Sequence, residues 1–341
     1  MSGRGPIRRL WVYVLRPHPK PLGGAFRRSV AALFQGVGIL SHRVEFMIDQ
    51  SRGSVVTEMG GVVAPAFVLA EDTFERLRTL IYDLSGIHLK DAKRNMVQSR
   101  LTQRLRVLEL TDFESYMDYL PGHPEELTDL VNRITTNKTY FFREKEHFRI
   151  LRDTVLPYAA GVCGERTPIT GWCAASSTGE EPYSIALMVA TFLAKNAGSS
   201  ARLLASDLDT NVLATAKRGI YPASVLSDLP RSFVSNFVVR NPDGEQGTFG
   251  LVPEVRNLLQ FRRINLMAAR FPIRSQLDFI FCRNVFIYFT REDRDNVVRR
   301  FIRVLKPGGI MFLGHSEVLD TKDFGGDIEF IGHTTYRKVS R

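Results

Sequence analysis

The first regular pattern of apolar positions is helical and ends near residue 134. Apolar side chains recur three and four positions apart in the first segment, where they are Phe74, Leu77, Ile81 and Leu84. Three further amphipathic segments follow, with apolar positions such as Val97, Leu101, Leu105, Leu108, Phe113, Tyr116, Leu120, Leu127, Leu130, Val131 and Ile134. This pattern predicts a small all-helical domain, which we assign with its linker to residues 59–148.

Local signals mark the ends of these helices. Gly86 follows the first one and permits the left-handed backbone that often ends a helix. Thr111 and Glu114 have the spacing of a capping box and predict the start of the third helix. Pro124 suits the first turn of the fourth, where a missing N–H costs nothing.

Beyond residue 167 short apolar runs of strand length alternate with helical patterns. The predicted strands are residues 169–173, 202–206, 258–262, 277–282 and 309–313, followed by a terminal hairpin at 328–331 and 335–339. Alternation of strands and helices predicts a mainly parallel, doubly wound sheet, with the hairpin as its antiparallel edge. We assign this α/β domain to residues 149–341.

Residues 221–260 interrupt that alternation. The stretch contains several prolines and the pair Asp243-Gly244, a typical hairpin turn between the runs 237–240 and 248–252. It predicts a small antiparallel β-subdomain inserted into the α/β domain.

The first 58 residues differ from the rest of the chain. They hold nine Arg or Lys against three acidic residues and so account for +6 of the net charge of +10. Three interpretations fit such a segment: a targeting peptide, a basic binding arm, or a non-native extension that precedes a true translation start at Met47 or Met59. We favour the extension, because no periodicity ties the segment to the helices, and we expect it to pack poorly.

Composition narrows the class of protein. A length of 341 residues fits about two domains, and no apolar run approaches the roughly 20 residues that span a bilayer. The cysteines have no metal-like or disulfide-like spacing, which indicates buried thiols in a reducing compartment; they are Cys163, Cys173 and Cys282. We therefore expect a cytoplasmic protein, a monomer, with no membrane insertion.

The stretch 168–184 reads as strand, small-residue loop and helix. In open α/β sheets ligands bind at such loops, outside the carboxyl ends of the strands. The glycine patterns of dinucleotide and P-loop sites are absent, and Glu180 and Glu181 stand where a phosphate would bind. Acidic groups suit a ligand with hydroxyls or positive charge, such as S-adenosylmethionine. Glu181 is assigned to that ligand, whereas Glu180 either contacts it or complements the helix dipole.

Two other stretches carry candidate chemistry. Asp207 ends the second strand, where an acidic side chain can hold ribose hydroxyls, and Asp209 is predicted to cap the next helix. Residues 135–148 combine Thr, Asn, aromatic, Arg and His side chains, which indicates elaborate capping or a loop that faces a site.

Several long motifs, in order, resemble the chemotaxis receptor methyltransferases, the CheR family. They are TTNKTYFFRE at 135–144, STGEEPYS at 177–184, ASDLDT at 205–210, NL at 265–266, FCRNVFIYF at 281–289, LKPGG at 305–309 and GHSE at 314–317. The resemblance covers residues 74–339 and leaves out residues 1–58.

The resemblance implies an S-adenosylmethionine-dependent O-methyltransferase that esterifies glutamate side chains on the cytoplasmic helices of chemoreceptors. It implies a class I methyltransferase domain, a helical N-terminal domain and the inserted β-subdomain, which in some members grips a receptor tail peptide; whether it does so here stays open. By motif, the cofactor contacts would be Asn137, Thr139, Arg143, Glu181, Asp207, Asn265, Leu266 and Asn284. Tyr288 would lie beside the transferred methyl group.

The chemistry of that reaction limits the groups required. A glutamate carboxylate is ionised near pH 7, so no general base is needed, and a sulfonium donor needs no metal. A guanidinium can hold a carboxylate by two parallel bonds, so Arg143 is predicted to orient either the acceptor or the methionine carboxylate. Tyr288 either orients the reacting groups or packs. His147 is read as structural, and the role of His315, after the fifth strand, stays open.

Lys93, Arg100 and Arg104 form a basic stripe on the second helix. The stripe is either a solvated face or a docking surface for the acidic helices of a receptor. Other readings of the whole chain are the same chemistry on a surface-attachment sensor, a nucleic-acid methyltransferase, a nicotinamide oxidoreductase and a non-catalytic adaptor. The nucleic-acid reading lacks a base clamp of the Pro-Pro-Tyr type, and we expect no nucleic-acid partner.

Overall fold

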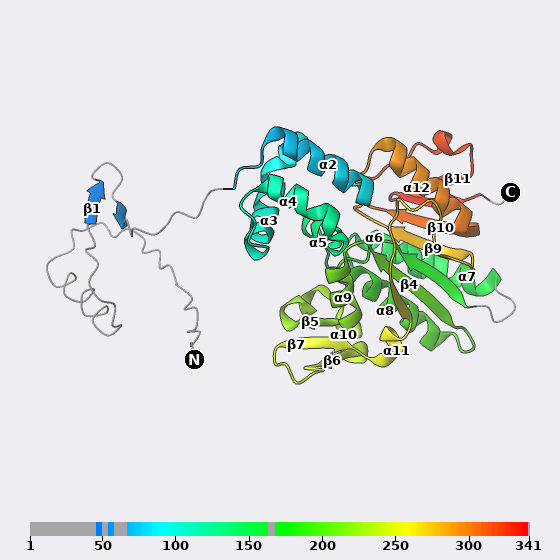
Figure 1. Ribbon diagram of the computed structural model, residues 1–341. Coiled ribbons are helices and arrows are strands. Elements are labelled where there is room, and N and C mark those ends of the chain that lie inside the picture. Colours follow the sequence, from blue (N-terminus) through cyan, green and yellow to red (C-terminus); the bar gives the residue numbers. More distant parts are fainter. Residues whose placement is uncertain (1–45, 50–53, 58–66, 163–167, 340–341) are drawn as a thin grey trace. The chain divides into compact units, whose positions relative to one another are not determined.

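The computed structural model describes residues 46–49, 54–57, 67–162 and 168–339 (Figure 1). The chain divides into two compact units, Met1–Ala66 and Phe67–Arg341. In the first unit, strands β1 (Phe46–Asp49) and β2 (Ser54–Thr57) pair antiparallel. Apart from these strands, the predictions made for residues 1–58 concern residues outside the described part of the chain.

The predicted all-helical domain is confirmed. Its helices are α2 (Glu71–Ser85), α3 (Arg94–Val107), α4 (Phe113–Tyr119) and α5 (Pro124–Ile134), with short 3₁₀ turns η1 (Asp91–Lys93) and η2 (Leu120–Gly122) between them. Side chains on the predicted apolar stripes, such as Phe74, Leu101 and Leu130, form one buried cluster. The domain therefore has a hydrophobic core of its own.

Two of the three helix ends predicted for this domain are confirmed, and the third is wrong. Gly86 is the left-handed cap of α2 (φ 75°), and Pro124 opens α5. The capping box predicted at Thr111 and Glu114 is wrong, because Asp112 caps α4 and accepts a hydrogen bond of 2.7 Å from the Ser115 N–H. The Glu114 carboxylate instead contacts Thr73 and Arg76 on α2.

Within residues 168–339 one sheet holds seven strands in the order β11-β12-β10-β9-β3-β4-β8. The strands are β3 (Ile169–Cys173), β4 (Ala201–Asp207), β8 (Leu259–Arg263), β9 (Leu277–Cys282), β10 (Leu305–Leu313), β11 (Ile328–Gly332) and β12 (Thr335–Lys338). The first five are parallel, and β11 and β12 form the antiparallel edge. This confirms the predicted doubly wound sheet with its antiparallel edge; its strand order reverses between β3 and β9.

Helices cover both faces of the sheet (Figure 1). Alternate residues of β9 separate the two layers: Phe279 and Phe281 pack with α8 (Glu180–Lys195), whereas Ile280 and Cys282 pack with α12 (Arg291–Val304). The remaining helical segments are α6 (Lys145–Ile150), the π-helical turn η3 (Leu151–Val155), α7 (Leu156–Val162), α9 (Thr210–Arg218), and the 3₁₀ turns η5 (Phe286–Tyr288) and η6 (Thr321–Phe324).

The inserted β-subdomain is a second sheet, and it lies between β4 and β8 in the chain. Within residues 220–251 it holds three antiparallel strands in the order β5-β7-β6. They are β5 (Ile220–Pro222), β6 (Val238–Arg240) and β7 (Thr248–Leu251), accompanied by η4 (Ala223–Asp228), α10 (Arg231–Phe237) and α11 (Pro253–Arg256). The predicted hairpin is β6 and β7. Strand β5 was not predicted, because three residues ending in proline carry no alternation.

Two expectations from composition can be compared with the described residues. Cys173 and Cys282 are buried free thiols, as predicted, whereas Cys163 lies outside the described residues. No helix in the described part of the chain has the length and hydropathy needed to cross a membrane.

Polar contacts join the helical domain to the sheet domain. The Tyr82 hydroxyl donates to the Asp293 carboxylate (2.8 Å), and the Asn265 side-chain amide donates to the carbonyl oxygen of Leu84 (2.9 Å). The His88 N–H donates to the carbonyl oxygen of Tyr288 (2.8 Å). The end of α2 is thereby held against the loops that follow β8 and β9.

Inside the helical domain a buried ion pair joins α3 to α5. Arg104 Nε lies 2.9 Å from Oε1 of Glu126, whose side chain is 2% exposed, and the Tyr116 hydroxyl donates to the same oxygen (2.9 Å). Removing one partner of a buried pair leaves an uncompensated charge.

We therefore expect Arg104→Met to lower the free energy of unfolding by about 3 kcal/mol, because Glu126 would lose its counter-charge. Urea unfolding followed by circular dichroism measures this. The control is Arg76→Met, whose partner Glu114 is 50% exposed; we expect that change to cost less than about 1 kcal/mol. Equal losses in the two variants would contradict the assignment.

Candidate active site

A cavity of about 160 Å³, open to solvent, lies at the carboxyl ends of β3, β4 and β9, where the strand order reverses. Ligands bind at this position in open α/β sheets. All residues predicted for the cofactor or for catalysis line it: Asn137, Thr139, Arg143, Glu181, Asp207, Asn265, Leu266, Asn284 and Tyr288. Their contacts with a cofactor stay a prediction, but the structure brings the side chains together.

Asp207 is fixed by the backbone around it. Its carboxylate accepts hydrogen bonds from the N–H groups of Ser177 (2.8 Å) and Asp209 (3.0 Å). Burial raises the pKa of Asp207 to about 6, although these backbone donors oppose the shift. The neighbouring Asp209 caps α9, as predicted, by accepting from the N–H groups of Asn211 and Val212.

Asn137 lines the cavity, but its side chain already has partners. The amide nitrogen donates to Asp209 Oδ2 (2.7 Å) and to the Thr135 hydroxyl (3.1 Å). The Thr135 hydroxyl also donates to Asp209 (2.7 Å). Residues 135–137 are therefore bound to the start of α9, and the polar loop predicted at 135–148 both caps and lines the cavity.

The small-residue loop between β3 and α8 allows close approach of backbone. Gly179 has φ 106°, and a Cβ there would lie 2.4 Å from the Tyr221 hydroxyl and 3.0 Å from Ala216. The same Tyr221 hydroxyl donates to the carbonyl oxygen of Thr178 (2.9 Å). The β-subdomain thus holds the loop, which a larger residue at position 179 would displace.

Arg283, which sequence reasoning missed, organises the buried side of the cavity. Its side chain is fully buried, and Nη1 donates to Glu181 (2.8 Å) while Nη2 donates to the carbonyl oxygen of Arg143 (2.6 Å). Burial raises the pKa of Glu181, and the charge of Arg283 opposes that shift. The signal was present in FCRNVFIYF, since Arg283 stands directly after a buried strand.

Arg143 lies at the cavity with spare hydrogen-bonding capacity. One guanidinium N–H donates to the carbonyl oxygen of Lys138 (3.0 Å), and the guanidinium carbon lies 5.7 Å from the Tyr140 ring centre. Its Nε lies 4.0 Å from Glu144. A guanidinium has five N–H donors, so several are left for a bound anion.

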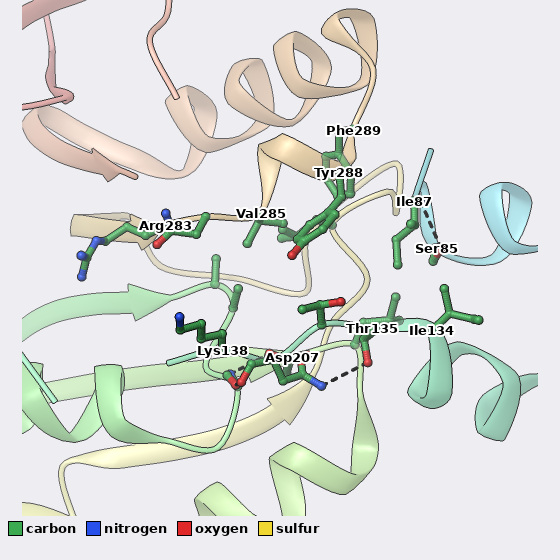
Figure 2. A pocket seen from close by; sticks show the side chains of 18 of the residues that line it. Ser85, Ile87, Ile134, Thr135, Lys138, Asp207, Arg283, Val285, Tyr288 and Phe289 are labelled. Atoms are coloured by element: carbon green, nitrogen blue, oxygen red, sulfur yellow. Dashed lines mark hydrogen bonds between the residues drawn. The ribbon is translucent and has the colours of Figure 1, made fainter. Parts of the chain in front are cut away.

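The loop after β9 presents Tyr288 and Asn284. Buried Glu317 fixes this loop by accepting from the N–H groups of Asn284 (2.9 Å), Phe286 (2.7 Å) and Gly314 (2.6 Å). Asn284 has φ 58°, a left-handed conformation that asparagine tolerates. The Tyr288 hydroxyl points into the cavity (Figure 2). Glu317 was not predicted, although it belongs to GHSE.

One wall of the cavity comes from the helical domain, which the sequence did not predict. Residues from the end of α2 to the first turn of α3 line it: Ser85, Ile87, His88, Leu89, Lys93 and Met96. Asn265 helps to hold this wall, because its side chain bonds both the carbonyl oxygen of Leu84 (2.9 Å) and the Met267 N–H (2.9 Å). Nothing in the local pattern indicates which part of another domain will cover a loop.

The basic stripe Lys93, Arg100 and Arg104 is divided in the structure. Lys93 is exposed at the edge of the cavity. Arg100 donates to the carbonyl oxygens of residues at the end of α5, Ile134 (2.7 Å) among them, and Arg104 pairs with Glu126. Two of the three cations thus have intramolecular partners. Their contact with a receptor stays a prediction.

Two family models match the chain, one after the other. The model described as "CheR methyltransferase, all-alpha domain" matches residues 72–135, and "CheR methyltransferase, SAM binding domain" matches residues 137–335. The first is the helical domain, and the second contains the sheet, the β-subdomain and the predicted cofactor residues.

Curated relatives agree. The chain is 41% identical over 251 residues to "Chemotaxis protein methyltransferase" of Escherichia coli, covering 73% of this chain and 85% of that one. It is 40% identical over 251 residues to "Chemotaxis protein methyltransferase 2" of Pseudomonas aeruginosa (74% and 88%). It is 38% identical over 294 residues to the Klebsiella aerogenes protein (85% and 98%). The chain therefore belongs to the CheR family of S-adenosylmethionine-dependent methyltransferases.

Proposed function

We propose that this protein transfers the methyl group of S-adenosylmethionine to glutamate side chains on the cytoplasmic helices of chemoreceptors. The product is a glutamyl methyl ester, formed in chemotaxis adaptation. The observation that carries the proposal is the convergence of Asp207, Glu181, Arg143 and Tyr288 on one cavity. We further propose that the protein works in the cytoplasm as a monomer.

The donor set of the cavity fits the cofactor. Asp207 offers a fixed carboxylate for ribose hydroxyls, and the small side chains Ala174, Ala175 and Ser177 line the cavity beside it. Bound there, S-adenosylmethionine supplies an electrophilic methyl group on a positively charged sulfur. Asn137, Thr139, Asn265, Leu266 and Asn284 are the further lining residues that we assign to its contacts.

The catalytic role of this chain's residues is to position the reactants, because the reaction requires no general base. A glutamate acceptor has an ordinary pKa of about 4.3 and is already ionised at neutral pH. We assign Arg143 to hold either one oxygen of the acceptor or the carboxylate of the cofactor, which leaves an attacking oxygen free. Tyr288, whose hydroxyl points into the cavity, orients the reacting groups (Figure 2).

The walls of the cavity supply the rest of the catalytic effect. Opposite charges meet and disappear in this reaction, so water, which stabilises separated charges, opposes it. The helical domain contributes one wall, which would exclude water from that side of the bound reactants. Alignment of donor and acceptor within such a site is worth several kcal/mol, of order 7 or more by effective-molarity estimates.

For the receptor we propose a docking surface that includes Lys93, Arg100 and Arg104, next to the cavity wall. Receptor helices that carry several glutamates are acidic, so an adjoining cationic surface complements them. A receptor tail peptide is a second candidate partner for the β-subdomain, since β6 lies at the edge of its sheet and an added strand could pair there.

The alternatives differ from this proposal in the acceptor. In the first alternative the acceptor is a glutamate carboxylate on a sensor of surface attachment. In the second the protein is a nucleic-acid methyltransferase and the acceptor is RNA or DNA. Labelled S-adenosylmethionine offered separately to membranes with candidate chemoreceptors and to nucleic acid distinguishes them. We expect base-labile label in the receptor fraction; label in RNA or DNA alone would refute the proposal.

Arg143→Ala should lower kcat/KM for receptor methylation by at least about 100-fold, because the carboxylate it orients would lose its register. Circular dichroism should show an intact fold. Arg149→Ala is the matched control, since Arg149 is exposed on α6, pairs with Glu146 and does not line the cavity. Unchanged turnover in the Arg143 variant would reject the role.

Affinity for S-adenosylmethionine should depend on pH through Asp207. With a pKa of about 6, its carboxylate is ionised above pH 7 and protonated below pH 5, where it loses an acceptor. Calorimetry should show constant affinity above pH 7 and a loss of about tenfold per pH unit well below pH 6.

The variant Asp207→Asn tests the same contact. Affinity at pH 8 should fall by about 10- to 100-fold, the value of a hydrogen bond to a charged group, and the pH dependence should disappear. Asp243→Asn, in the exposed β6–β7 turn, should retain both. If cofactor affinity in the Asp207 variant still depended on pH, the titrating group would be a residue other than Asp207.

Lys93→Glu should weaken receptor binding by about tenfold at low salt and less at high salt, because an exposed charge acts through a screened field. This single change leaves the Arg104–Glu126 pair intact. Lys195→Glu, exposed at the end of α8, is the charge-matched control. Cofactor affinity is measured alongside, since Lys93 lines the cavity. Unaltered receptor affinity would place the docking surface elsewhere.

A further inference from the structure

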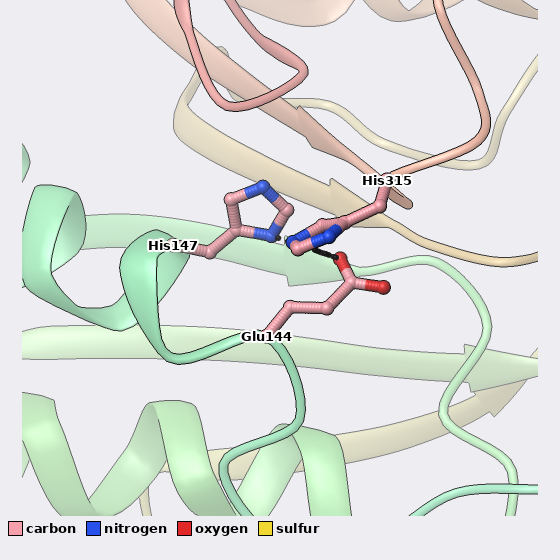
Figure 3. Close-up of side chains that lie close together, drawn as sticks. All are labelled: Glu144, His147 and His315. Atoms are coloured by element: carbon pink, nitrogen blue, oxygen red, sulfur yellow. Dashed lines mark ion pairs between the residues drawn. The ribbon is translucent and has the colours of Figure 1, made fainter.

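Beside the cavity lies a cluster that methyl transfer does not use: Glu144, His147 and His315 (Figure 3). Glu144 Oε2 lies 3.5 Å from His147 Nδ1 and 3.5 Å from His315 Nε2. One ligand atom from each residue lies within 4.8 Å of the others. None of the three side chains lines the cavity, so the cluster is separate from the proposed cofactor site.

Two atoms at the centre of the cluster are buried and lack a hydrogen-bond partner. They are Oε2 of Glu144 and Nδ1 of His147, whose side chain is fully buried. Arg283 Nη2 lies 3.0 Å from Glu144 Oε2, but it forms an ion pair without hydrogen-bond geometry and donates to the carbonyl oxygen of Arg143 instead. The carboxylate oxygen thus has a cationic neighbour, whereas Nδ1 of His147 is left unsatisfied; unsatisfied buried polar atoms are rare and point to a missing partner such as an ion.

The tautomer of His147 directs a lone pair at this point. Its Nε2 lies 2.5 Å from the carbonyl oxygen of His333. A carbonyl oxygen only accepts, so Nε2 carries the hydrogen and Nδ1 keeps a free lone pair on the side of Glu144. Metal-ligating histidines are oriented in this manner, by donating the other ring N–H to a backbone carbonyl or carboxylate.

The exposure of His315 and the spacing of the three groups also favour a cation. The carboxylates of Glu144 and Glu181 share the guanidinium of Arg283, and Arg143 Nε lies 4.0 Å from the other oxygen of Glu144. His315 is 60% exposed and can rotate, because the structure gives its ring no hydrogen bond. A tetrahedral zinc site places ligand atoms about 3.3 Å apart at zinc–ligand distances of about 2.0 Å, close to the two separations of Glu144 from the imidazoles.

We propose that Glu144, His147 and His315 bind a divalent transition-metal cation, for which Zn²⁺ is the best match, with water as the fourth ligand. Two imidazoles and one carboxylate are ligands that Zn²⁺ prefers, whereas Mg²⁺ and Ca²⁺ require oxygen. The ion would join the loop before α6, α6 itself and the loop after β10. It serves stability or regulation, since methyl transfer to a carboxylate requires no metal.

The test uses the full chain after treatment with a chelator. Isothermal titration with Zn²⁺ should show one saturable site that requires the cluster, and the midpoint of thermal unfolding should rise by about 5 °C at 100 times Kd. Mg²⁺ at the same concentration should produce no shift. Absence of a saturable site would overturn the proposal.

Variants identify the ligands. His315→Gln removes an exposed ligand without emptying the core, and it should weaken Zn²⁺ binding by at least about tenfold. His333→Asn is the matched control, because His333 is exposed, has a positive φ that Asn tolerates, and contacts the cluster through its backbone carbonyl. It should bind Zn²⁺ as the parent does.

Two outcomes would count against these ligands. Equal affinity of the parent and the His315 variant would refute the assignment, as would equal losses in the two variants. Circular dichroism of each variant shows that its fold is intact. Glu144→Gln, which keeps the shape of the side chain and removes its charge, should repeat the loss seen with His315→Gln.

Discussion

A buried guanidinium connects the parts of the candidate site. Arg283 donates to Glu181 at the start of α8, forms an ion pair with Glu144 and donates to the carbonyl oxygen of Arg143. Burial raises the pKa of Glu144, but the charge of Arg283 outweighs it and leaves that pKa below its ordinary value. Because a buried cation requires such partners, the three segments are held in one arrangement.

The same arrangement explains how distant motifs reach one cavity. Arg143 approaches from the loop before α6, Asp207 from the end of β4, and Tyr288 from the turn after β9. Parallel strands end at a common edge, so loops that follow them meet whatever their separation in the chain. Hydrogen bonds between side chains and backbone N–H groups fix these loops. The buried Glu317 carboxylate accepts from the Asn284 N–H, and the Asp207 carboxylate accepts from the Ser177 N–H.

The helical domain has two tasks in this architecture. Its core is self-contained, and the Arg104–Glu126 pair belongs to it. Its junction with the sheet domain, at Tyr82, Leu84 and His88, positions a wall of the cavity. A docking surface next to that wall would place a receptor helix close to the proposed methyl donor.

The sequence by itself determined the main elements of the helical and sheet domains, their order and the family. Period and turn residues predicted the helical domain, the parallel strands and the inserted hairpin, since these depend on neighbours a few positions apart. Motifs indicated candidate cofactor residues, and the cavity brings these side chains together. Local signals were less decisive where two neighbouring residues could cap the same helix. Asp112, and not Thr111, caps α4, because the Asp112 carboxylate accepts from the Ser115 N–H.

Only the tertiary structure decided the partners of the charged residues. Whether Arg104 faces solvent or Glu126, and whether Arg283 bridges Glu181 and Glu144, depends on segments up to 139 positions away being packed together. The wall contributed by α2 and α3 and the convergence of Glu144, His147 and His315 have the same origin. Such contacts leave no period in the sequence, because long-range packing, and not local conformational preference, creates them.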